Sequence, residues 1–383
     1  MVSRIAQGVL ERLLQHFPVV GLLGPRQCGK STLAREILQN RSDSVYLDLE
    51  LPSDLARLAD AEMYLRAQQG KLVCLDEIQQ KPELFPLLRG LCDEWGRPGC
   101  FLVLGSASRD LLRQTSESLA GRIVYKHLTP FLEAEWGGRG EVSQYYSRGG
   151  FPRSLLADDN ELSYTWRESF ITTFLARDLL QWKNFTPAMV GRLWQMLAHW
   201  NGQTLNYSAL ANALGITSVT VKSYIDLLES TFMVLVLRPF ITNTGKRLVK
   251  APKVYVADAG ITCALLQIRD YSVLVGHPVW GTVWEQIVLV NLQAQVPDGQ
   301  FSYYRTTHGA EVDIVLQRGT VRIAIECKAT VAPVLTRGNH QALTDLTPHH
   351  FFVVCPIESG WPIREGRVVS LKELISEIGR ILK

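Results

Sequence analysis

The chain has 383 residues, of which 46% are hydrophobic and 20% charged, with a formal net charge of +3 at pH 7. Its length exceeds the size at which one hydrophobic core stops growing, so we expect two or three domains of an ordinary globular protein. No apolar run approaches the roughly 18 residues that cross a bilayer, and the small net charge does not by itself indicate a nucleic-acid-binding protein.

The N-terminal segment, residues 1–15, mixes charged and apolar residues with helical spacing and lacks the pattern of a signal peptide. The seven cysteines are scattered and form neither a CxxC pair nor a Cys/His cluster of zinc spacing. We therefore expect reduced, buried thiols and a cytoplasmic protein without membrane association.

The segment Gly24–Ser31 fits the phosphate-binding pattern G-x-x-x-x-G-K-[ST] at every fixed position. It lies between an expected strand, residues 17–23, and an expected helix, residues 31–38. Its glycines permit backbone angles that turn N–H groups inward, and the helix N-terminus adds positive partial charge. Lys30 is expected to reach the β- and γ-phosphates of ATP, and the Ser31 hydroxyl to ligate Mg²⁺. The predicted nucleotide-binding residues of this loop are Gly24, Pro25, Arg26, Gln27, Cys28, Gly29, Lys30, Ser31 and Thr32.

Two adjacent carboxylates supply a second nucleotide signature. An expected strand, residues 44–50, is followed by a polar helical stretch and then by an apolar run that ends in Asp76 and Glu77. At the end of a buried parallel strand, Asp76 can bind the hydration shell of Mg²⁺ and Glu77 can orient and polarise the attacking water. Paired acids are common by composition alone, so the weight of this signal comes from its place after a phosphate-binding loop.

Two more strands complete the expected core. Residues 100–105 form one, and Ser106, which follows it, is placed to sense the γ-phosphate. Residues 123–128 form the other. Strands that alternate with helices over residues 15–130 predict a doubly wound parallel sheet.

With these motifs the sequence resembles the AAA+-like P-loop ATPases of bacteria and archaea, in particular a group that couples the ATPase to a C-terminal domain of unknown function. The matching segments are GPRQCGKST at 24–32, LDEIQ at 75–79, LGSAS at 104–108, LAGR at 119–122 and GGFP at 149–152. The resemblance implies ATP hydrolysis, with Ser106 as first sensor, Arg122 as arginine finger and Arg153 as a candidate second sensor. Such a finger usually comes from a neighbouring subunit, which implies a homo-oligomer. The structural alternative for Arg122 is a helix-end salt bridge.

The middle of the chain is expected to be helical and then to form a winged helix. Residues 154–200 carry aromatic and leucine residues at core spacing and predict a helical lid. A helix over 206–215 ends at a glycine, and a second helix over 217–228 begins at a Thr/Ser cap. This pair indicates a helix-turn-helix, and expected strands at 232–237 and 253–257 enclose a basic turn.

Basic residues gather in this region. Between Glu229 and Asp258 there are five, Arg238, Lys246, Arg247, Lys250 and Lys253, and no acid. Clustered Lys and Arg side chains release counterions when they contact phosphates, so we expect DNA as a partner. The alternative is a structural lid or a protein-contact module. The predicted DNA contacts are Thr217, Ser218, Thr220, Lys222, Ser223, Lys246, Arg247 and Lys250.

The C-terminal third carries a different constellation. A helix around Glu285 is followed by two alternating segments, residues 311–316 and 321–328, whose junction predicts a hairpin. Asp313, Glu326 and Lys328 are expected to share a face of that hairpin and to converge.

This order resembles the restriction-endonuclease-like family, in which an Asp, a hairpin and (Asp/Glu)-x-Lys follow an acid on the first helix. The resemblance implies that Glu285, Asp313 and Glu326 hold Mg²⁺ and that Lys328 orients water or neutralises developing charge.

We therefore predict an α/β protein with three parts: an AAA+-like ATPase core (1–150), a helical lid and winged helix (151–260), and a PD-(D/E)XK nuclease-like domain (261–383). The leading hypothesis is a Mg²⁺-dependent ATPase that acts on DNA. Two alternatives stay open: an ATP-gated metal-dependent endonuclease on branched DNA, and a nucleotide switch that scaffolds a protein partner.

Overall fold

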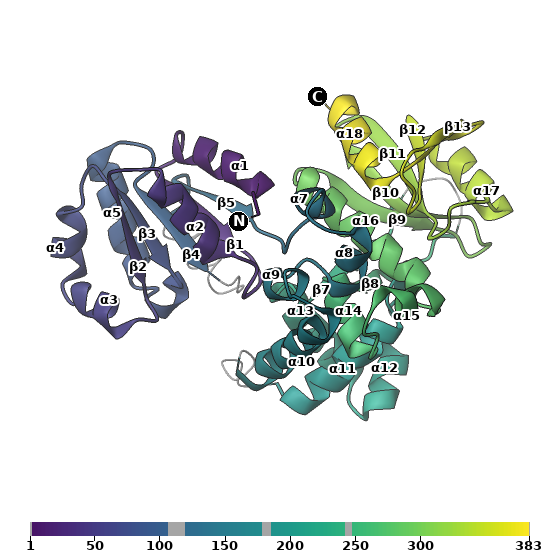
Figure 1. The fold of residues 1–383 in the computed structure, drawn as a ribbon, viewed down its shortest axis with the longest axis horizontal. Coiled ribbons are helices and arrows are strands. Elements are labelled where there is room, and N and C mark those ends of the chain that lie inside the picture. Colours follow the sequence, from purple (N-terminus) through teal and green to yellow (C-terminus); the bar gives the residue numbers. More distant parts are fainter. Residues whose placement is uncertain (1, 106–118, 178–184, 242–246, 383) are drawn as a thin grey trace. The chain divides into compact units, whose positions relative to one another are not determined.

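A computed structural model describes residues 2–105, 119–177, 185–241 and 247–382 of the chain (Figure 1). The chain divides into two compact units, Met1–Phe131 with Ser230–Phe232, and Leu132–Glu229 with Met233–Lys383. The predicted division into three domains stays a prediction, because the expected winged helix and the expected nuclease-like part lie together in the second unit.

The first unit is built on a parallel sheet with the strand order β2-β3-β4-β1-β5. Its strands are β1 (Val19–Leu23), β2 (Ser44–Asp48), β3 (Leu72–Asp76), β4 (Phe101–Gly105) and β5 (Ile123–His127). Each lies within a segment that the sequence predicts as a strand. Its helices are α1 (Ile5–Leu14), α2 (Lys30–Gln39), α3 (Pro52–Arg57), α4 (Ala61–Arg66), α5 (Leu84–Trp95) and the 3₁₀ turn η1 (Ile78–Gln80).

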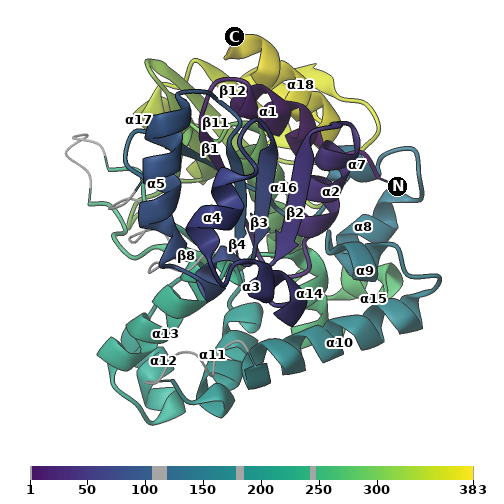
Figure 2. The same cartoon turned by 90° about the vertical axis from the view of Figure 1, so that its left-hand side faces the viewer.

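Helices cover both faces of this sheet because its central strands are apolar on both sides. Helices α1 and α2 lie on one face, and α3, α4 and α5 lie on the other, which is turned toward the viewer in Figure 2. Alternate residues of each strand enter the two cores, as the period of two requires. Val19, Leu23, Val73, Leu75, Phe101 and Val103 face one core, and Val20, Leu22, Leu72, Cys74, Leu102 and Leu104 face the other.

The second unit begins with helices. They are α7 (Glu133–Trp136), α8 (Val142–Arg148), α9 (Pro152–Leu155), α10 (Asn160–Arg177), α11 (Pro187–His199), α12 (Tyr207–Leu214) and α13 (Ser218–Ser230). The predicted helix pair is present: Asn206 caps α12, Gly215 ends it with φ 66°, and the Thr217 hydroxyl accepts the Thr220 N–H at 3.1 Å. A small antiparallel sheet follows, formed by β6 (Gln203–Thr204), β8 (Lys253–Val256) and β7 (Val234–Leu237).

A six-stranded sheet forms the C-terminal part, in the order β13-β14-β12-β11-β10-β9. Its strands are β9 (Gln300–Arg305), β10 (Glu311–Arg318), β11 (Val321–Cys327), β12 (His350–Val354), β13 (Trp361–Ile363) and β14 (Gly366–Val369). The accompanying helices are α14 (Ala259–Leu265), α15 (Tyr271–Gly276), α16 (Trp280–Gln295), α17 (Arg337–Leu346) and α18 (Leu371–Ile381). The predicted hairpin is β10–β11, and α17 and α18 lie on opposite sides of this sheet (Figure 1).

The segment after β7, where the sequence predicts a basic turn, lies along the edge strand β9 on both sides of residues 242–246. Phe240 N donates to Tyr303 O at 2.7 Å, and Thr307 N donates to Arg247 O at 3.0 Å. Phe240 and Leu248 also pack on the core between the sheet and α17. The main chain on both sides of residues 242–246 is therefore docked on the C-terminal sheet.

Candidate functional site

The phosphate-binding loop joins the end of β1 to the start of α2. Two of its residues, Gln27 (φ 61°) and Gly29 (φ 102°), have left-handed backbone angles, which lets successive N–H groups turn the same way. A Cβ at Gly24 would lie 2.3 Å from the Leu128 carbonyl oxygen. Glycine is therefore required at position 24 by close packing, and at position 29 by the backbone angle.

Lys30 points back into this loop. Its ammonium donates to the carbonyls of Gly24 at 3.0 Å and Pro25 at 2.9 Å, and the residue is only 6% exposed. A buried cation enclosed by the main chain of a glycine-containing loop is placed to exchange those carbonyls for phosphate oxygens.

Arg4 is hydrogen-bonded to the main chain of the loop, a contact that the sequence motifs do not indicate. Its guanidinium donates to Cys28 O at 3.0 Å and to Thr129 O at 2.6 Å, and it lies 4.7 Å from the ring centre of Phe131. Arg4 thus ties the loop to the segment that leaves β5. Residue spacing carries no signal for it, because the two contacts are 24 and 125 residues away.

The two predicted acids lie at the carboxyl end of β3. Asp76 is 2% exposed and accepts hydrogen bonds from the Tyr46 hydroxyl at 2.5 Å and from Glu77 N at 2.9 Å. Tyr46, on β2, was not among the predicted site residues. The contact arises because the paired strands β2 and β3 place residues 46–48 beside residues 74–76.

Glu77 has an unusual backbone and an unusual environment. Its φ of 55° lies in the left-handed region, which is costly for a residue with a Cβ, and its carboxylate accepts a hydrogen bond from the Gln79 amide. Burial raises the pKa of Glu77, while the positive charges of Lys30 and Arg26 oppose that rise. The loop follows β1 and Glu77 follows β3, so both lie at the carboxyl edge of the same parallel sheet.

Arg122 forms the salt bridge that the structural alternative anticipated. Its guanidinium donates to both oxygens of Asp93 on α5, at 2.6 and 2.9 Å. It precedes β5, whose first residue pairs with Val19 at the start of β1. The phosphate-binding loop follows the other end of β1, about 13 Å of strand away. Arg122 is therefore remote from the loop of its own chain.

The roles of the two predicted sensors, Ser106 and Arg153, both stay predictions. Ser106 lies outside the described residues, so its predicted role stays a prediction. Arg153 is exposed on α9 in the second unit and also stays a prediction.

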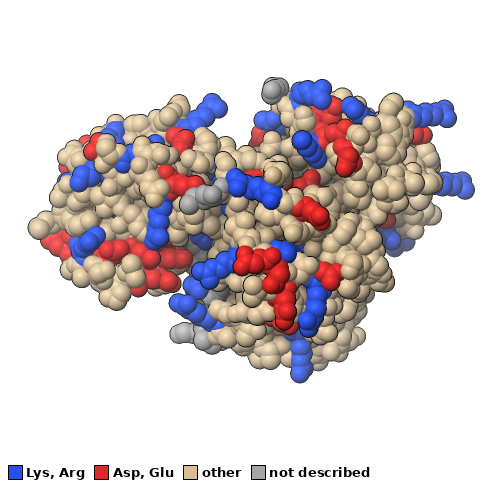
Figure 3. All heavy atoms as spheres, in the orientation of Figure 1, with Lys and Arg blue, Asp and Glu red and all other residues tan. Residues whose placement is uncertain are grey.

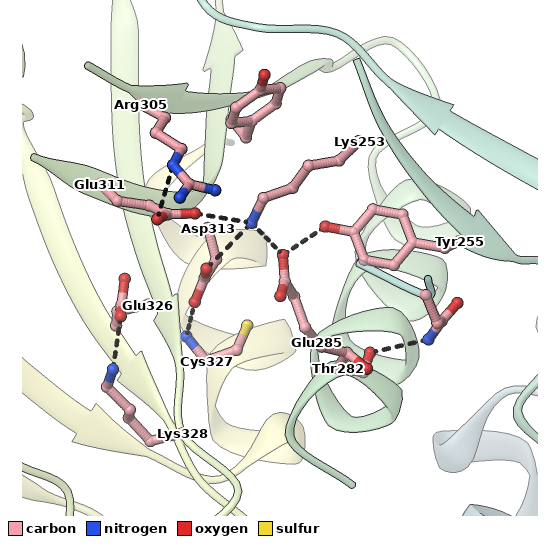
Figure 4. Close-up of polar contacts among 12 residues, drawn as sticks. Lys253, Tyr255, Thr282, Glu285, Arg305, Glu311, Asp313, Glu326, Cys327 and Lys328 are labelled. Atoms are coloured by element: carbon pink, nitrogen blue, oxygen red, sulfur yellow. Dashed lines mark hydrogen bonds and ion pairs between the residues drawn. The ribbon is translucent and has the colours of Figure 1, made fainter. Parts of the chain in front are cut away.

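The C-terminal acids meet around a lysine (Figure 4). The Lys253 ammonium lies 2.9 Å from a Glu285 oxygen, 3.2 Å from Glu311 and 3.3 Å from Asp313. Lys253 is 3% exposed, and the Tyr255 hydroxyl also donates to Glu285. The sequence analysis counts Lys253 among the clustered basic residues; its side chain is instead buried among acids and cannot contribute to a basic surface.

The predicted convergence of Asp313, Glu326 and Lys328 is met only in part. Glu326 and Lys328 pair at 2.8 Å, whereas Asp313 turns to Lys253 and accepts the Cys327 N–H at 3.0 Å. The register of β10 with β9 shifts between Val312 and Val315, and such a bulge re-aims side chains. Simple alternation along the hairpin could not predict this shift.

Burial sets the charge balance of this cluster. Burial and the neighbouring Asp313 raise the pKa of Glu285 to about 7, against the pull of Lys253. Burial and Asp313 also raise the pKa of Glu326 to about 8. Burial opposes the charge on Lys253, but the carboxylates of Glu285, Asp313 and Glu311 outweigh it and raise the Lys253 pKa well above its usual value.

These acids do not match a divalent-metal site. Within the described residues, no group of three or more His, Cys, Asp or Glu side chains is arranged to hold a metal ion. In the same part of the chain, no helix is long and apolar enough to cross a bilayer.

The predicted DNA contacts lie on the start of α13 and on the docked segment. Thr217, Lys222 and Ser223 are exposed, and Ser218 and Thr220 are half-buried. Val219, between them, is 79% exposed. Arg247 and Lys250 are also exposed, and Lys246 lies outside the described residues. On the face drawn in Figure 3, basic and acidic side chains are interspersed.

Comparisons with known proteins assign three regions. Residues 16–136 match the family described as AAA domain. Residues 139–272 and 280–374 match two domains of unknown function, DUF8612 and DUF4143. Over 379 residues the chain is 38% identical to the uncharacterized protein Rv2008c of Mycobacterium tuberculosis, covering 99% of this chain and 85% of that protein. The uncharacterized protein Mb2031c of Mycobacterium bovis gives the same values.

The chain belongs to the family of these mycobacterial proteins. Its first unit contains an AAA-type P-loop ATPase domain, as the sequence predicts. The names of the family's other two regions assign no activity, so neither the winged helix nor the nuclease-like domain is confirmed.

Solved structures give weaker matches. The Thermotoga maritima RuvB Holliday junction branch migration motor is 17% identical, with a TM-score of 0.31, over 64% of this chain and 93% of that chain. AMPPCP-bound DnaA from Aquifex aeolicus is 12% identical, with a TM-score of 0.30, over 59% and 86%. Identities and TM-scores this low assign no role to this chain.

Proposed function

We propose that this AAA protein hydrolyses ATP in a Mg²⁺-dependent reaction at the loop Gly24–Ser31. The observation that carries the proposal is the placement of Lys30 inside the loop that follows β1, and of the buried Asp76 and its neighbour Glu77 at the end of β3 in the same parallel sheet. A positive group for the phosphate and an acid for the water, both at the carboxyl ends of strands in one parallel sheet, are what phosphoryl transfer to water needs.

The residues present suit a phosphate and its magnesium ion. The close packing at Gly24 leaves the loop main chain free of side-chain bulk, and the buried Lys30 supplies positive charge. Ser31 and Asp76 offer hydroxyl and carboxylate oxygens, the ligands that Mg²⁺ prefers. When bound, Mg²⁺ supplies charge neutralisation of the phosphate oxygens.

Glu77 would take the catalytic role of orienting and deprotonating the attacking water. Its raised pKa brings it closer to the operating pH, where a general base is most effective. The strained backbone at φ 55° and the Gln79 hydrogen bond hold the carboxylate in one orientation.

The test is ATP turnover in Lys30→Ala. We expect turnover to fall to background, because the change removes the ammonium that lies inside the loop. Lys372→Ala, an exposed lysine on α18, is the matched control and should leave turnover unchanged. Full turnover in Lys30→Ala would contradict the proposal.

We further propose that the protein works as a homo-oligomer and contacts DNA through α13. Arg122 is remote from its own loop, so any role as a finger requires a neighbouring subunit.

The start of α13 presents Thr217, Lys222 and Ser223 to solvent together with Val219. Hydroxyl and ammonium groups suit phosphates and base edges, and an exposed methyl-bearing side chain suits the thymine methyl.

The DNA proposal predicts salt-sensitive binding. Lys222→Ala should weaken duplex binding and reduce the salt slope by roughly one phosphate contact, while Lys372→Ala should not. DNA should also stimulate ATP turnover of the wild-type protein. Binding that is absent, or that does not respond to salt, would favour the alternative of a nucleotide switch that scaffolds a protein partner.

A further inference from the structure

The Lys253 ammonium contacts two of the acids that the sequence predicts as metal ligands, Glu285 and Asp313. Lys253 is the first residue of β8, and its ammonium sits between Glu285 of α16 and two acids of β10, Glu311 and Asp313. In Figure 4 these carboxylates converge on the lysine from different elements. Two of the three acids predicted to hold a metal, Glu285 and Asp313, are therefore gathered, but around a cation that belongs to the chain.

The polar groups of this cluster are matched to an ammonium ion. Lysine has three N–H donors, and three carboxylates lie at 2.9, 3.2 and 3.3 Å from Nζ. The acceptors are further engaged, since Asp313 accepts from Cys327 N and Glu285 accepts from the Tyr255 hydroxyl. The spacing is that of N–H···O hydrogen bonds, whereas Mg²⁺ demands near-octahedral oxygens at about 2.0–2.1 Å.

The lysine cannot leave this position without a large penalty. Its main chain is paired on both sides, with Thr204 of β6 and Leu237 of β7. A buried ammonium that lost its carboxylates would be desolvated and unpaired, which is strongly unfavourable. The remaining predicted acid, Glu326, is paired with Lys328 instead.

Other contacts link the same segments. Tyr303 N donates to Arg238 O at 3.1 Å, and Val249 N donates to Arg305 O at 3.0 Å, so the chain on both sides of residues 242–246 is bonded to β9. The Tyr303 ring lies 5.5 Å from the Lys253 ammonium. The acidic cluster thus stands at a joint between the small sheet and the C-terminal sheet.

We propose that Lys253 is the resident cation of this cluster in place of a divalent metal, and that the cluster is an ion-pair joint between β8 and the C-terminal sheet rather than a nuclease centre. The proposal concerns a site separate from the ATPase loop. It replaces the alternative of a metal-dependent endonuclease.

The test is Mn²⁺ binding to the full-length, nucleotide-free protein, counted by electron paramagnetic resonance. Wild type and Asp313→Asn should bind the same number of ions, because Asp313 already holds Lys253. Lys253→Met should bind one Mn²⁺ more than the double variant Lys253→Met/Asp313→Asn, because three carboxylates are then left without their cation. Lys253→Arg keeps the charge and should bind no more than wild type. Circular dichroism checks that each variant is folded.

Two results would overturn the proposal. One is an ion in the wild-type protein that Asp313→Asn abolishes. This comparison needs no change at Lys253, so it decides the matter even where Lys253→Met does not fold. The other is a folded Lys253→Met protein that gains no Asp313-dependent ion, which would show that these acids do not form a cation site open to metal. Because ATP is absent, neither result depends on ATPase activity.

Discussion

Arg122 is held by Asp93 through two parallel hydrogen bonds, of 2.6 Å from Nε and 2.9 Å from Nη2. Hydrogen bonding to this guanidinium lowers the pKa of the Asp93 carboxyl below its usual value. The pair lies in solvent, with side chains 33% and 54% exposed, so a stronger anion can compete for the arginine. In the homo-oligomer that we propose, the γ-phosphate of a nucleotide on a neighbouring subunit is such an anion.

A finger in trans predicts complementation between two inactive proteins. Arg122→Ala alone and Lys30→Ala alone should each lose ATP turnover, and mixing them should restore part of it, because an intact loop then meets an intact arginine. Arg89→Ala, another exposed arginine near Asp93, is the control and should keep turnover. A mixture as inactive as its components would refute the trans arrangement.

Tyr46→Phe should raise the Mg²⁺ concentration needed for half-maximal ATP turnover. The change removes the hydroxyl that donates to Asp76 and leaves a buried carboxylate oxygen short of a partner, at a stability cost of about 1–3 kcal/mol. The measurement is turnover as a function of Mg²⁺. Tyr64→Phe, on α4 of the same unit, is the control; equal Mg²⁺ curves for the two variants would show that Tyr46 does not position Asp76.

Gly24→Ala should lower the melting temperature and weaken nucleotide binding. The added Cβ would lie 2.3 Å from the Leu128 carbonyl, so the loop backbone must move, at a cost of about 1–3 kcal/mol. Gly90→Ala is the opposite case. Gly90 is exposed within α5 with open space around its Cβ position, so alanine should stabilise the helix by up to about 1 kcal/mol. Thermal unfolding of both variants measures the contrast.

Glu133→Gln should remove part of the pH dependence of stability. Burial raises the pKa of Glu133 to about 7, against a hydrogen bond with Tyr146. Between pH 4.5 and 7 the folded protein therefore holds a proton that the unfolded chain has released. The contribution of Glu133 to the free energy of unfolding is fully present below pH 4.5 and is lost as the pH rises through 7.

The glutamine stays neutral at every pH, so Glu133→Gln should gain stability over wild type between pH 5 and pH 8, on the order of 1–2 kcal/mol. Denaturant unfolding at the two pH values is the measurement. Glu161→Gln, exposed on α10, should show no such change. A pH-independent difference between wild type and Glu133→Gln would place the pKa of Glu133 in its ordinary range.

Local patterns in the sequence were sufficient to predict the strands and the nucleotide motifs of the ATPase core. The loop Gly24–Ser31 is a contiguous motif, and the three central strands β1, β3 and β4 are short apolar runs that the parallel sheet buries on both faces. The acids at 76 and 77 follow such a run directly. For these features the information lies within a few residues, so sequence reasoning reached them.

The residues that contact this loop and these acids could not be predicted from local sequence patterns. Arg4 reaches Cys28 and Thr129, and Tyr46 reaches Asp76, through contacts set by strand order and helix packing rather than by spacing. Neither Arg4 nor Tyr46 belongs to a sequence motif. No periodicity distinguishes either of them from an ordinary surface arginine or strand tyrosine.

For the C-terminal constellation, the sequence by itself determined which acids are present, Glu285, Asp313 and Glu326, and that a hairpin carries two of them. The tertiary structure decided what they bind. The register of β10 shifts around Asp313, which pairs with Lys253, and the pairing of β8 buries Lys253 among the carboxylates, although the sequence groups this lysine with a basic cluster. A buried charge takes its partner from the fold, because only residues brought together by packing can repay its desolvation.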